Sequence, residues 1–158
     1  MYAILHILAD ERGVALRTEG LGNLPVIRAD ESRLFNAIYN LVNNAIPEVP
    51  SGGSVTVQGR TDASGKKVVL SVIDTGKGMS PEVRDSLFTY QAISRKIGGT
   101  GLGTKIVKDV VDAHGGNIRV ESTQGVGTAF HITLSVEGPP ANSPRTSPSP
   151  AETGRMTL

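Results

Sequence analysis

One carboxylate lies where a predicted strand opens into a loop that contains glycine. Residues 69–79 read VLSVIDTGKGM, so Asp74 follows an apolar run and precedes Gly76 and Gly78. A carboxylate at a strand end can serve as a fixed hydrogen-bond acceptor, and nearby glycines let a ligand approach the backbone. Taken alone, an Asp before two glycines is more often a turn residue. Its interpretation therefore depends on what else the chain brings to the same place.

A second group of glycines opens a predicted helix further along the chain. Residues 98–103 read GGTGLG, and a helical apolar pattern follows. Gly99, Gly101 and Gly103 would expose backbone N–H groups at the helix N-terminus, which attracts phosphate. Two common phosphate motifs do not fit. The Walker motif needs Lys directly after its last glycine, where this chain has Thr104, and the dinucleotide fingerprint GxGxxG has a different spacing.

A predicted helix with Asp30 as its N-cap runs to about residue 46 and separates apolar from amide side chains. At 100° per residue its apolar residues share one broad face, and its asparagines share the other. The asparagines are Asn36, Asn40, Asn43 and Asn44. Asn is less favourable than Ala inside a helix by several tenths of a kcal/mol, so four of them suggest a polar ligand. A solvated polar face is the alternative.

The remaining pattern predicts the fold class. Two hairpins are expected, one from 54–60 and 66–74 and one from 117–122 and 128–136, and short helical segments lie between them. Strands and helices alternate without a strict βαβ rhythm. We therefore predict an α/β fold, a two-layer sandwich with a mixed, mostly antiparallel sheet and helices on one face.

Composition excludes several classes of function. The net charge is +1 and there is no Trp, which disfavours nucleic acid as a partner. The chain has no Cys, and its three His have no ligand-like spacing, so a zinc site is not expected. No apolar run reaches the length of a membrane span. We expect a cytoplasmic domain without direct membrane contact, whether or not the full-length protein is anchored.

Three segments are expected. Residues 1–12 are interpreted as the remnant of a preceding helix or a chain edge, and 13–137 as the folded domain. Residues 138–158 hold five of the nine prolines and no aromatic residue. Such a segment cannot bury enough apolar surface to order itself, so a disordered tail is expected.

Taken in order, the motifs resemble the ATP-binding catalytic domain of sensor histidine kinases, in the Bergerat-fold superfamily shared with gyrase, Hsp90 and MutL. The motifs are NLVNNA (40–45), DTGKGM (74–79), LF (87–88), GGTGLGTKIV (98–107) and GVGTAF (125–130). The resemblance covers about residues 12–136. It implies a kinase that uses ATP and Mg²⁺ and transfers the γ-phosphoryl group to a His on a separate dimerisation domain, which passes it to a response regulator.

The resemblance also implies roles for individual residues. Asp74 matches the Asp that accepts a hydrogen bond from the adenine 6-amino group, which selects ATP over GTP. Asn44 matches the Asn whose oxygen binds Mg²⁺, and Asn40 matches the first Asn of the same motif. In the ATPase branch that first position is a Glu acting as general base. An amide cannot take the proton, so slow hydrolysis is expected.

The other matched residues would surround the nucleotide. Gly76 and Gly78 would approach the base, and Thr128 would support the adenine pocket beside Asp74. The backbone of Gly99, Gly101, Leu102 and Gly103 would face the phosphates. Residues 87–98 would form a lid, in which Lys96 resembles a Lys that pairs with phosphate; a solvated surface charge is the alternative.

The chain departs from the family at several positions. Pro47 stands where many sensor kinases have Lys, a second lid Phe is missing from 90–93, and Thr104 and Lys105 replace an apolar pair. No His is followed by an acidic residue, as the family's phosphoacceptor is. We expect His6, His114 and His131 to be structural, with His114 at a helix end where positive charge is favourable.

Two other functions stay open. One is a nucleotide-gated binding module without catalysis, and the other is a serine kinase that acts on an anti-sigma antagonist.

Overall fold

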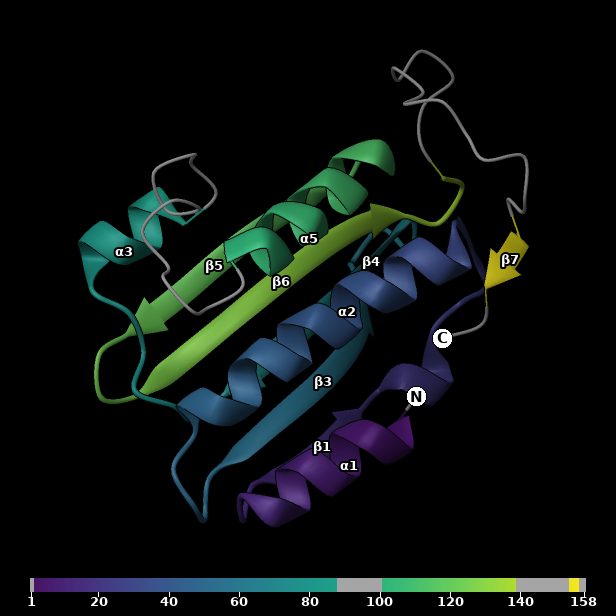
Figure 1. Cartoon of the computed structure of the whole chain (residues 1–158). Coiled ribbons are helices and arrows are strands. Elements are labelled where there is room, and N and C mark those ends of the chain that lie inside the picture. The colour runs from purple at the N-terminus through teal and green to yellow at the C-terminus, as the bar shows by residue number, and fades with distance from the viewer. Residues whose placement is uncertain (1, 88–100, 139–153, 157–158) are drawn as a thin grey trace.

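The domain is built on a five-stranded sheet, and helices cover one face of this sheet (Figure 1). The computed structural model describes residues 2–87, 101–138 and 154–156. The sheet has the order β1-β3-β4-β6-β5; β1 pairs with β3 in parallel, and the other neighbours are antiparallel. The strands are β1 (Ala15–Glu19), β3 (Ser54–Thr61), β4 (Lys67–Asp74), β5 (Asn117–Thr123) and β6 (Gly127–Ser135). The predicted α/β sandwich is therefore confirmed.

The helices lie in one layer. In Figure 1, α1 (Tyr2–Glu11), α2 (Glu31–Ala45) and α5 (Gly101–Ala113) lie side by side against the sheet. The shorter elements are η1 (Leu21–Asn23), β2 (Ile27–Ala29), η2 (Ile46–Glu48), α3 (Pro81–Ser86) and β7 (Gly154–Met156). No helix in the described ranges has the length and apolar content needed to cross a membrane.

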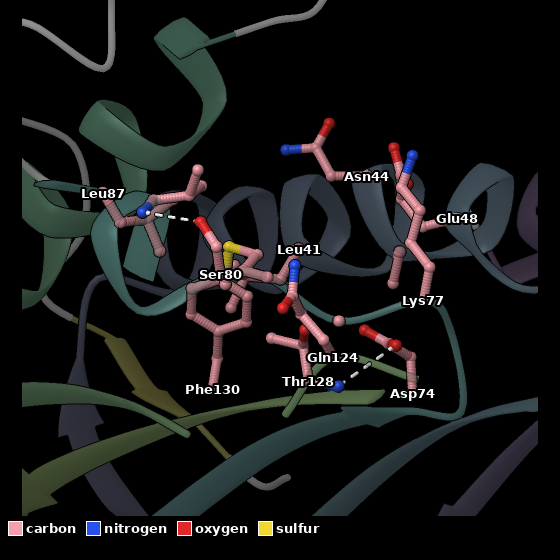
Figure 2. Close-up of a pocket in the computed structure, with 14 residues that line it drawn as sticks. Leu41, Asn44, Glu48, Asp74, Lys77, Ser80, Leu87, Gln124, Thr128 and Phe130 are labelled. Atoms are coloured by element: carbon pink, nitrogen blue, oxygen red, sulfur yellow. Dashed lines mark hydrogen bonds and ion pairs between the residues drawn. The ribbon is translucent and has the colours of Figure 1, made fainter. Parts of the chain in front are cut away.

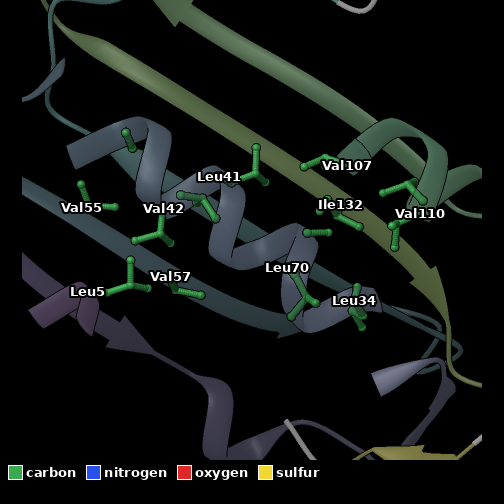
Figure 3. Packing of buried hydrophobic residues seen from close by; sticks show 14 of the residues in the cluster. Leu5, Leu34, Leu41, Val42, Val55, Val57, Leu70, Val107, Val110 and Ile132 are labelled. Atoms are coloured by element: carbon green, nitrogen blue, oxygen red, sulfur yellow. The ribbon is translucent and has the colours of Figure 1, made fainter. Parts of the chain in front are cut away.

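Helix α2 forms as its sequence predicts. The side chain of Asp30 accepts a hydrogen bond from the Arg33 backbone N–H at 3.1 Å, which satisfies one of the free donors at the helix start. Its apolar stripe, which includes Leu34 and Val42, is buried. The stripe packs on alternate residues of β3, β4 and β6, as Figure 3 shows. Helix α2 thus presents its amide face away from this core.

His114 connects the ends of two helices. Its Nδ1 lies 2.7 Å from the Val110 carbonyl oxygen at the end of α5, and its Nε2 accepts the Asp30 backbone N–H at 2.9 Å. An imidazole that accepts at Nε2 and donates at Nδ1 is neutral. The structural role predicted for His114 is confirmed. The ring contributes through these two hydrogen bonds and not through the favourable positive charge expected at this helix end.

The opposite face of the sheet is polar along one row. His131 of β6 pairs in register with Ser71 of β4, and its Nδ1 lies 2.7 Å from the Ser71 hydroxyl. Its Nε2 lies 3.4 Å from a Glu121 carboxylate oxygen. Ser71 is only 2% exposed, so its hydroxyl forms this hydrogen bond with His131 in a buried position. His131 is therefore structural, as predicted.

Helix α1 and strand β7, the first and last elements that the structure describes, both contact other elements. Helix α1, which lies in the segment expected to precede the folded domain, contributes Leu5 and Ala9 to the main core. The tail expected to be disordered includes β7, which pairs antiparallel with β2. Such strand pairing uses backbone groups and does not require apolar side chains. Residues 139–153 and 157–158 lie outside the described part.

Candidate functional site

A cavity of about 540 Å³ opens between the end of α2, the loop after β4, and α3. Figure 2 shows its lining, which is apolar on one side and polar at the bottom and rim. The lining residues are Leu41, Asn44, Ala45, Glu48, Asp74, Lys77, Gly78, Met79, Ser80, Val83, Leu87, Gln124, Thr128 and Phe130. Its size is that of a small-molecule site.

Asp74 is fixed at the bottom of this cavity. It is the last residue of β4, is 9% exposed, and pairs in register with Thr128 of β6. Its Oδ1 accepts the Gly76 backbone N–H at 2.8 Å and the Thr128 backbone N–H at 3.3 Å. Figure 2 shows the other carboxylate oxygen directed into the cavity. One oxygen is therefore held by the protein while the other faces the space for a ligand.

The surroundings disfavour the charge on Asp74. Burial raises the pKa of Asp74 above its ordinary value, the two backbone N–H groups oppose the rise, and the negative charge of Glu48 adds to it. An acceptor that is poorly solvated gains more from a ligand donor than a solvated acceptor would.

The loop glycines are needed for contacts within the protein. Gly78 has φ +69°, and a Cβ there would lie 2.2 Å from the Thr123 carbonyl oxygen. A Cβ on Gly76 would lie 2.7 Å from the Glu48 carbonyl oxygen. Gly78 lines the cavity, whereas Gly76 lines a separate hollow on the outer side of the loop. Both glycines were expected to let a ligand approach the backbone, and their close packing against other chain segments is by itself a sufficient reason for glycine at these positions.

The two motif asparagines are placed differently. Asn44 lines the cavity at the rim, on the side opposite Asp74 (Figure 2). Asn40, one turn earlier, is not among the described lining residues, and its Nδ2 donates to the Asn36 carbonyl oxygen at 2.9 Å. The amide face predicted for α2 therefore contributes one described residue to the cavity wall, Asn44.

The remaining predicted residues lie at or beyond the edge of the described part. Lys96 and Gly99 fall outside the described residues. Helix α5 begins at Gly101 and includes Leu102 and Gly103 in its first turn. Figure 1 shows that α5 begins near the end of the domain where α2 ends and β6 begins. The structure thus brings Asn44, Asp74, Gly78 and Thr128 to one cavity and places the start of α5 near it.

Several residues of the site were not predicted. Ser122 of β5 accepts the Met79 backbone N–H at 2.8 Å and lies 2.9 Å from the Thr128 hydroxyl, so it joins the loop to the sheet. Met79, Leu87 and Phe130 provide apolar walls. These three residues stand inside the quoted motifs, which could have marked them. Ser122 has no local signal, because its role depends on strand register.

The arrangement suits a flat, partly polar ring. An acceptor lies at the bottom, apolar side chains flank it, and a polar rim opens to solvent. Among the described residues, no three His, Cys, Asp or Glu side chains group as a metal site.

Comparison with known proteins identifies the family. Residues 29–138 match the family of histidine kinase-, DNA gyrase B- and HSP90-like ATPases. The sensor histidine kinase ZraS of Salmonella typhi is 36% identical over 128 residues, which make up 81% of this chain and 27% of ZraS. The chain thus spans about a quarter of the length of that relative.

Solved structures agree with this match. The catalytic domain of the histidine kinase ThkA has a TM-score of 0.74 and 25% identity, covering 86% of this chain and 88% of the other. Full-length ShkA has a TM-score of 0.70 and 29% identity, covering 85% of this chain and 30% of the other. The resemblance seen in the motifs is confirmed: this chain belongs to the histidine kinase-, DNA gyrase B- and HSP90-like ATPase family, as the catalytic ATP-binding domain of the sensor histidine kinase type.

Proposed function

We propose that the cavity binds Mg²⁺-ATP and that the domain transfers the γ-phosphoryl group to a His side chain on a separate dimerisation domain, from which a response regulator receives it. The observation that carries the proposal is Asp74, held through one oxygen by two backbone N–H groups and presenting the other oxygen to the cavity. ATP and the response regulator would place this activity in the cytoplasm. ShkA, a structural relative, was solved in complex with AMPPNP, which supports a nucleotide as the ligand.

Asp74 would select the base. Its cavity-facing oxygen accepts a hydrogen bond from the 6-amino group of adenine. Guanine has a carbonyl oxygen at the same position, and two acceptors would face each other without a proton between them. Thr128 and Ser122 keep the carboxylate in place through the sheet register and the loop. Met79 and Phe130 would pack on the faces of the ring.

Asn44 would act at the phosphate end. Its amide oxygen is a neutral ligand, so it can hold Mg²⁺ without repelling the triphosphate, and Mg²⁺ keeps water and phosphate oxygens as its other ligands. When bound, the ion neutralises charge on the phosphates. The backbone of Gly99, Gly101, Leu102 and Gly103 and the side chain of Lys96 are proposed as further phosphate contacts.

Asn40 would keep hydrolysis slow. An amide has no basic site that could remove a proton from water at neutral pH. The Asn40 side chain is also engaged with the Asn36 carbonyl oxygen of its own helix. The phosphoryl group would then remain on ATP until an acceptor His approaches.

Two measurements test the proposal. Calorimetry should give tight binding of Mg²⁺-ATP and Mg²⁺-ADP, with GTP far weaker; equal affinity for ATP and GTP would contradict the role of Asp74. Radiolabelled ATP, mixed with the domain and a separately made acceptor domain, should yield an acid-labile label on the acceptor. The matched control is the same acceptor with its His replaced by Gln. Tight binding without transfer would favour a nucleotide-gated module, and an acid-stable label would favour a serine kinase.

A further inference from the structure

Lys77 places a positive charge in the wall of the cavity. Of the lining residues that the structure describes, it is the only one with a positive charge, whereas Glu48 and Asp74 are negative. Its Nζ lies 2.8 Å from a Glu48 carboxylate oxygen. Figure 2 shows that the Lys77 side chain extends from beside Asp74 and meets the Glu48 carboxylate at the rim, on the side where Asn44 lies. Lys77, the one positively charged side chain among the described lining residues, thus lies at the end of the cavity where the phosphates are proposed to bind.

The Lys77 side chain can move although its backbone is fixed. The Lys77 backbone N–H donates to the Glu48 carbonyl oxygen at 3.4 Å, and Gly76 and Gly78 on either side are tightly packed. The side chains of Lys77 and Glu48 are 77% and 50% exposed, so their ion pair adds little stability. A second hollow of about 400 Å³ borders the pair on its outer side. Lys77 can therefore leave Glu48 at low cost.

Glu48 makes the position of Lys77 important. The negative charge of Glu48 already contributes to the raised pKa of Asp74, so it acts on the interior of the cavity. The same charge would repel a polyphosphate at the rim. Lys77 offsets that charge while the two are paired, and its ammonium group can form charge-assisted hydrogen bonds to a phosphate oxygen as well as to a carboxylate oxygen.

We infer that Lys77 is a phosphate-contacting residue of the nucleotide site, held by Glu48 while the site is empty and exchanging that carboxylate for a phosphate oxygen when nucleotide binds. The exchange involves no covalent step. It rests on the proposed function, because it takes the phosphates to lie at the Asn44 end. Asp74 would distinguish nucleotides by their base. Lys77 would distinguish them by their phosphates.

A ligand series separates this role from a role in base binding. Adenosine, ADP and ATP are titrated with Mg²⁺ into the wild type, Lys77→Met, Lys77→Arg and Glu48→Gln, using calorimetry and, for adenosine, NMR chemical shifts. Lys77→Met should weaken ADP and ATP binding about 10- to 30-fold and leave adenosine within about twofold. Lys77→Arg should restore most of the loss. Glu48→Gln should strengthen ATP binding about two- to fivefold, because the competing carboxylate is gone.

The matched control is Lys108→Met. Lys108 forms a similar exposed ion pair with Asp112 at 2.7 Å on α5 and is not among the described lining residues. This variant should bind all three ligands as the wild type does. An equal loss of adenosine and ATP in Lys77→Met, unchanged ATP binding in that variant, or the same loss in Lys108→Met would overturn the inference. If the wild type binds neither adenosine nor ATP, the proposed function fails instead. Circular dichroism checks that each variant is folded.

Discussion

Replacing Asp74 with Asn separates the charge of the site from its shape. The Oδ1 position accepts two backbone N–H groups, at 2.8 and 3.3 Å, and only the oxygen of an amide can do the same. The Asn side chain is therefore oriented by the protein, with its NH₂ group directed into the cavity. An NH₂ group there faces the 6-amino group of adenine, so two donors meet where an acceptor and a donor met before.

The size of the effect follows from this orientation. The variant loses one hydrogen bond to a charged acceptor, about 1.5–3 kcal/mol, and leaves two donors poorly paired, about 1 kcal/mol more. A total of about 2.5–4 kcal/mol corresponds to ATP binding about 70- to 900-fold weaker. The same NH₂ group can donate to the 6-carbonyl of a hypoxanthine or guanine base. Binding of ITP relative to ATP should therefore rise in the variant.

The empty protein should respond in the opposite direction. Because burial raises the pKa of Asp74 in the folded protein above its ordinary value, ionisation of Asp74 destabilises the folded state, and stability falls as pH rises through the raised pKa. Asn removes the buried charge and keeps both backbone hydrogen bonds. The variant should melt higher than the wild type at pH 7, by roughly 2–4 °C if the gain is about 1 kcal/mol. The difference should shrink as pH falls toward 4.

The assay compares calorimetric affinities for ATP and ITP with melting temperatures of the empty proteins at pH 7 and pH 4. Wild-type ATP affinity should also fall on acidification, because a protonated Asp74 would carry its proton on the cavity-facing oxygen. Thr75→Ser, next to Asp74 in the chain but not among the described lining residues, serves as control. Retention of ATP affinity within fivefold in the Asn variant would refute the base-reading role, and a lower melting temperature at pH 7 would refute the account of the buried charge.

Two further substitutions test the supporting structure. Gly78→Ala should destabilise the fold by about 1–3 kcal/mol in chemical denaturation, because its φ is positive and the new Cβ would meet the Thr123 carbonyl oxygen. The control is Gly22→Ala, where no atom lies within 4 Å of the new Cβ, and it should change stability by less than about 1 kcal/mol. Equal effects of the two substitutions would contradict the packing role of Gly78. His114→Ala should cost about 2–4 kcal/mol, because the Asp30 N–H and a carbonyl of α5 both lose their partner, and a loss below about 0.5 kcal/mol would show that water replaces the ring.

Local patterns predicted most of the fold. Helix α2 was predicted from Asp30 to about residue 46 because a cap, an apolar stripe and a following Pro all agree, and it spans Glu31–Ala45. The hairpins β3–β4 and β5–β6 were predicted from alternation and turn residues. The proximity of Asp74 and Thr128 was expected only through the resemblance, because nothing local indicates that β4 pairs with β6.

Features set by tertiary contact could not be predicted. Asn40 and Asn44 have the same residue type and the same helix face, yet only Asn44 is among the described lining residues. One turn of rise along α2 decides the difference. The pairing of β7 with β2 depends on an available strand edge and not on the composition of the tail. The Lys77–Glu48 pair joins residues from separate segments, and no sequence spacing marks it.

The register that aligns Asp74 with Thr128 has a consequence for folding rates. The hairpins β3–β4 and β5–β6 each close a short turn, whereas pairing β4 with β6 must close a loop of 53 residues between Asp74 and Thr128. Such a long closure is slow, so the two halves of the cavity meet late in folding. A ligand held between Asp74 and Thr128 then stabilises contacts absent from the early chain. Such a ligand would act mainly by slowing unfolding, so an occupied site would lengthen the lifetime of the folded domain.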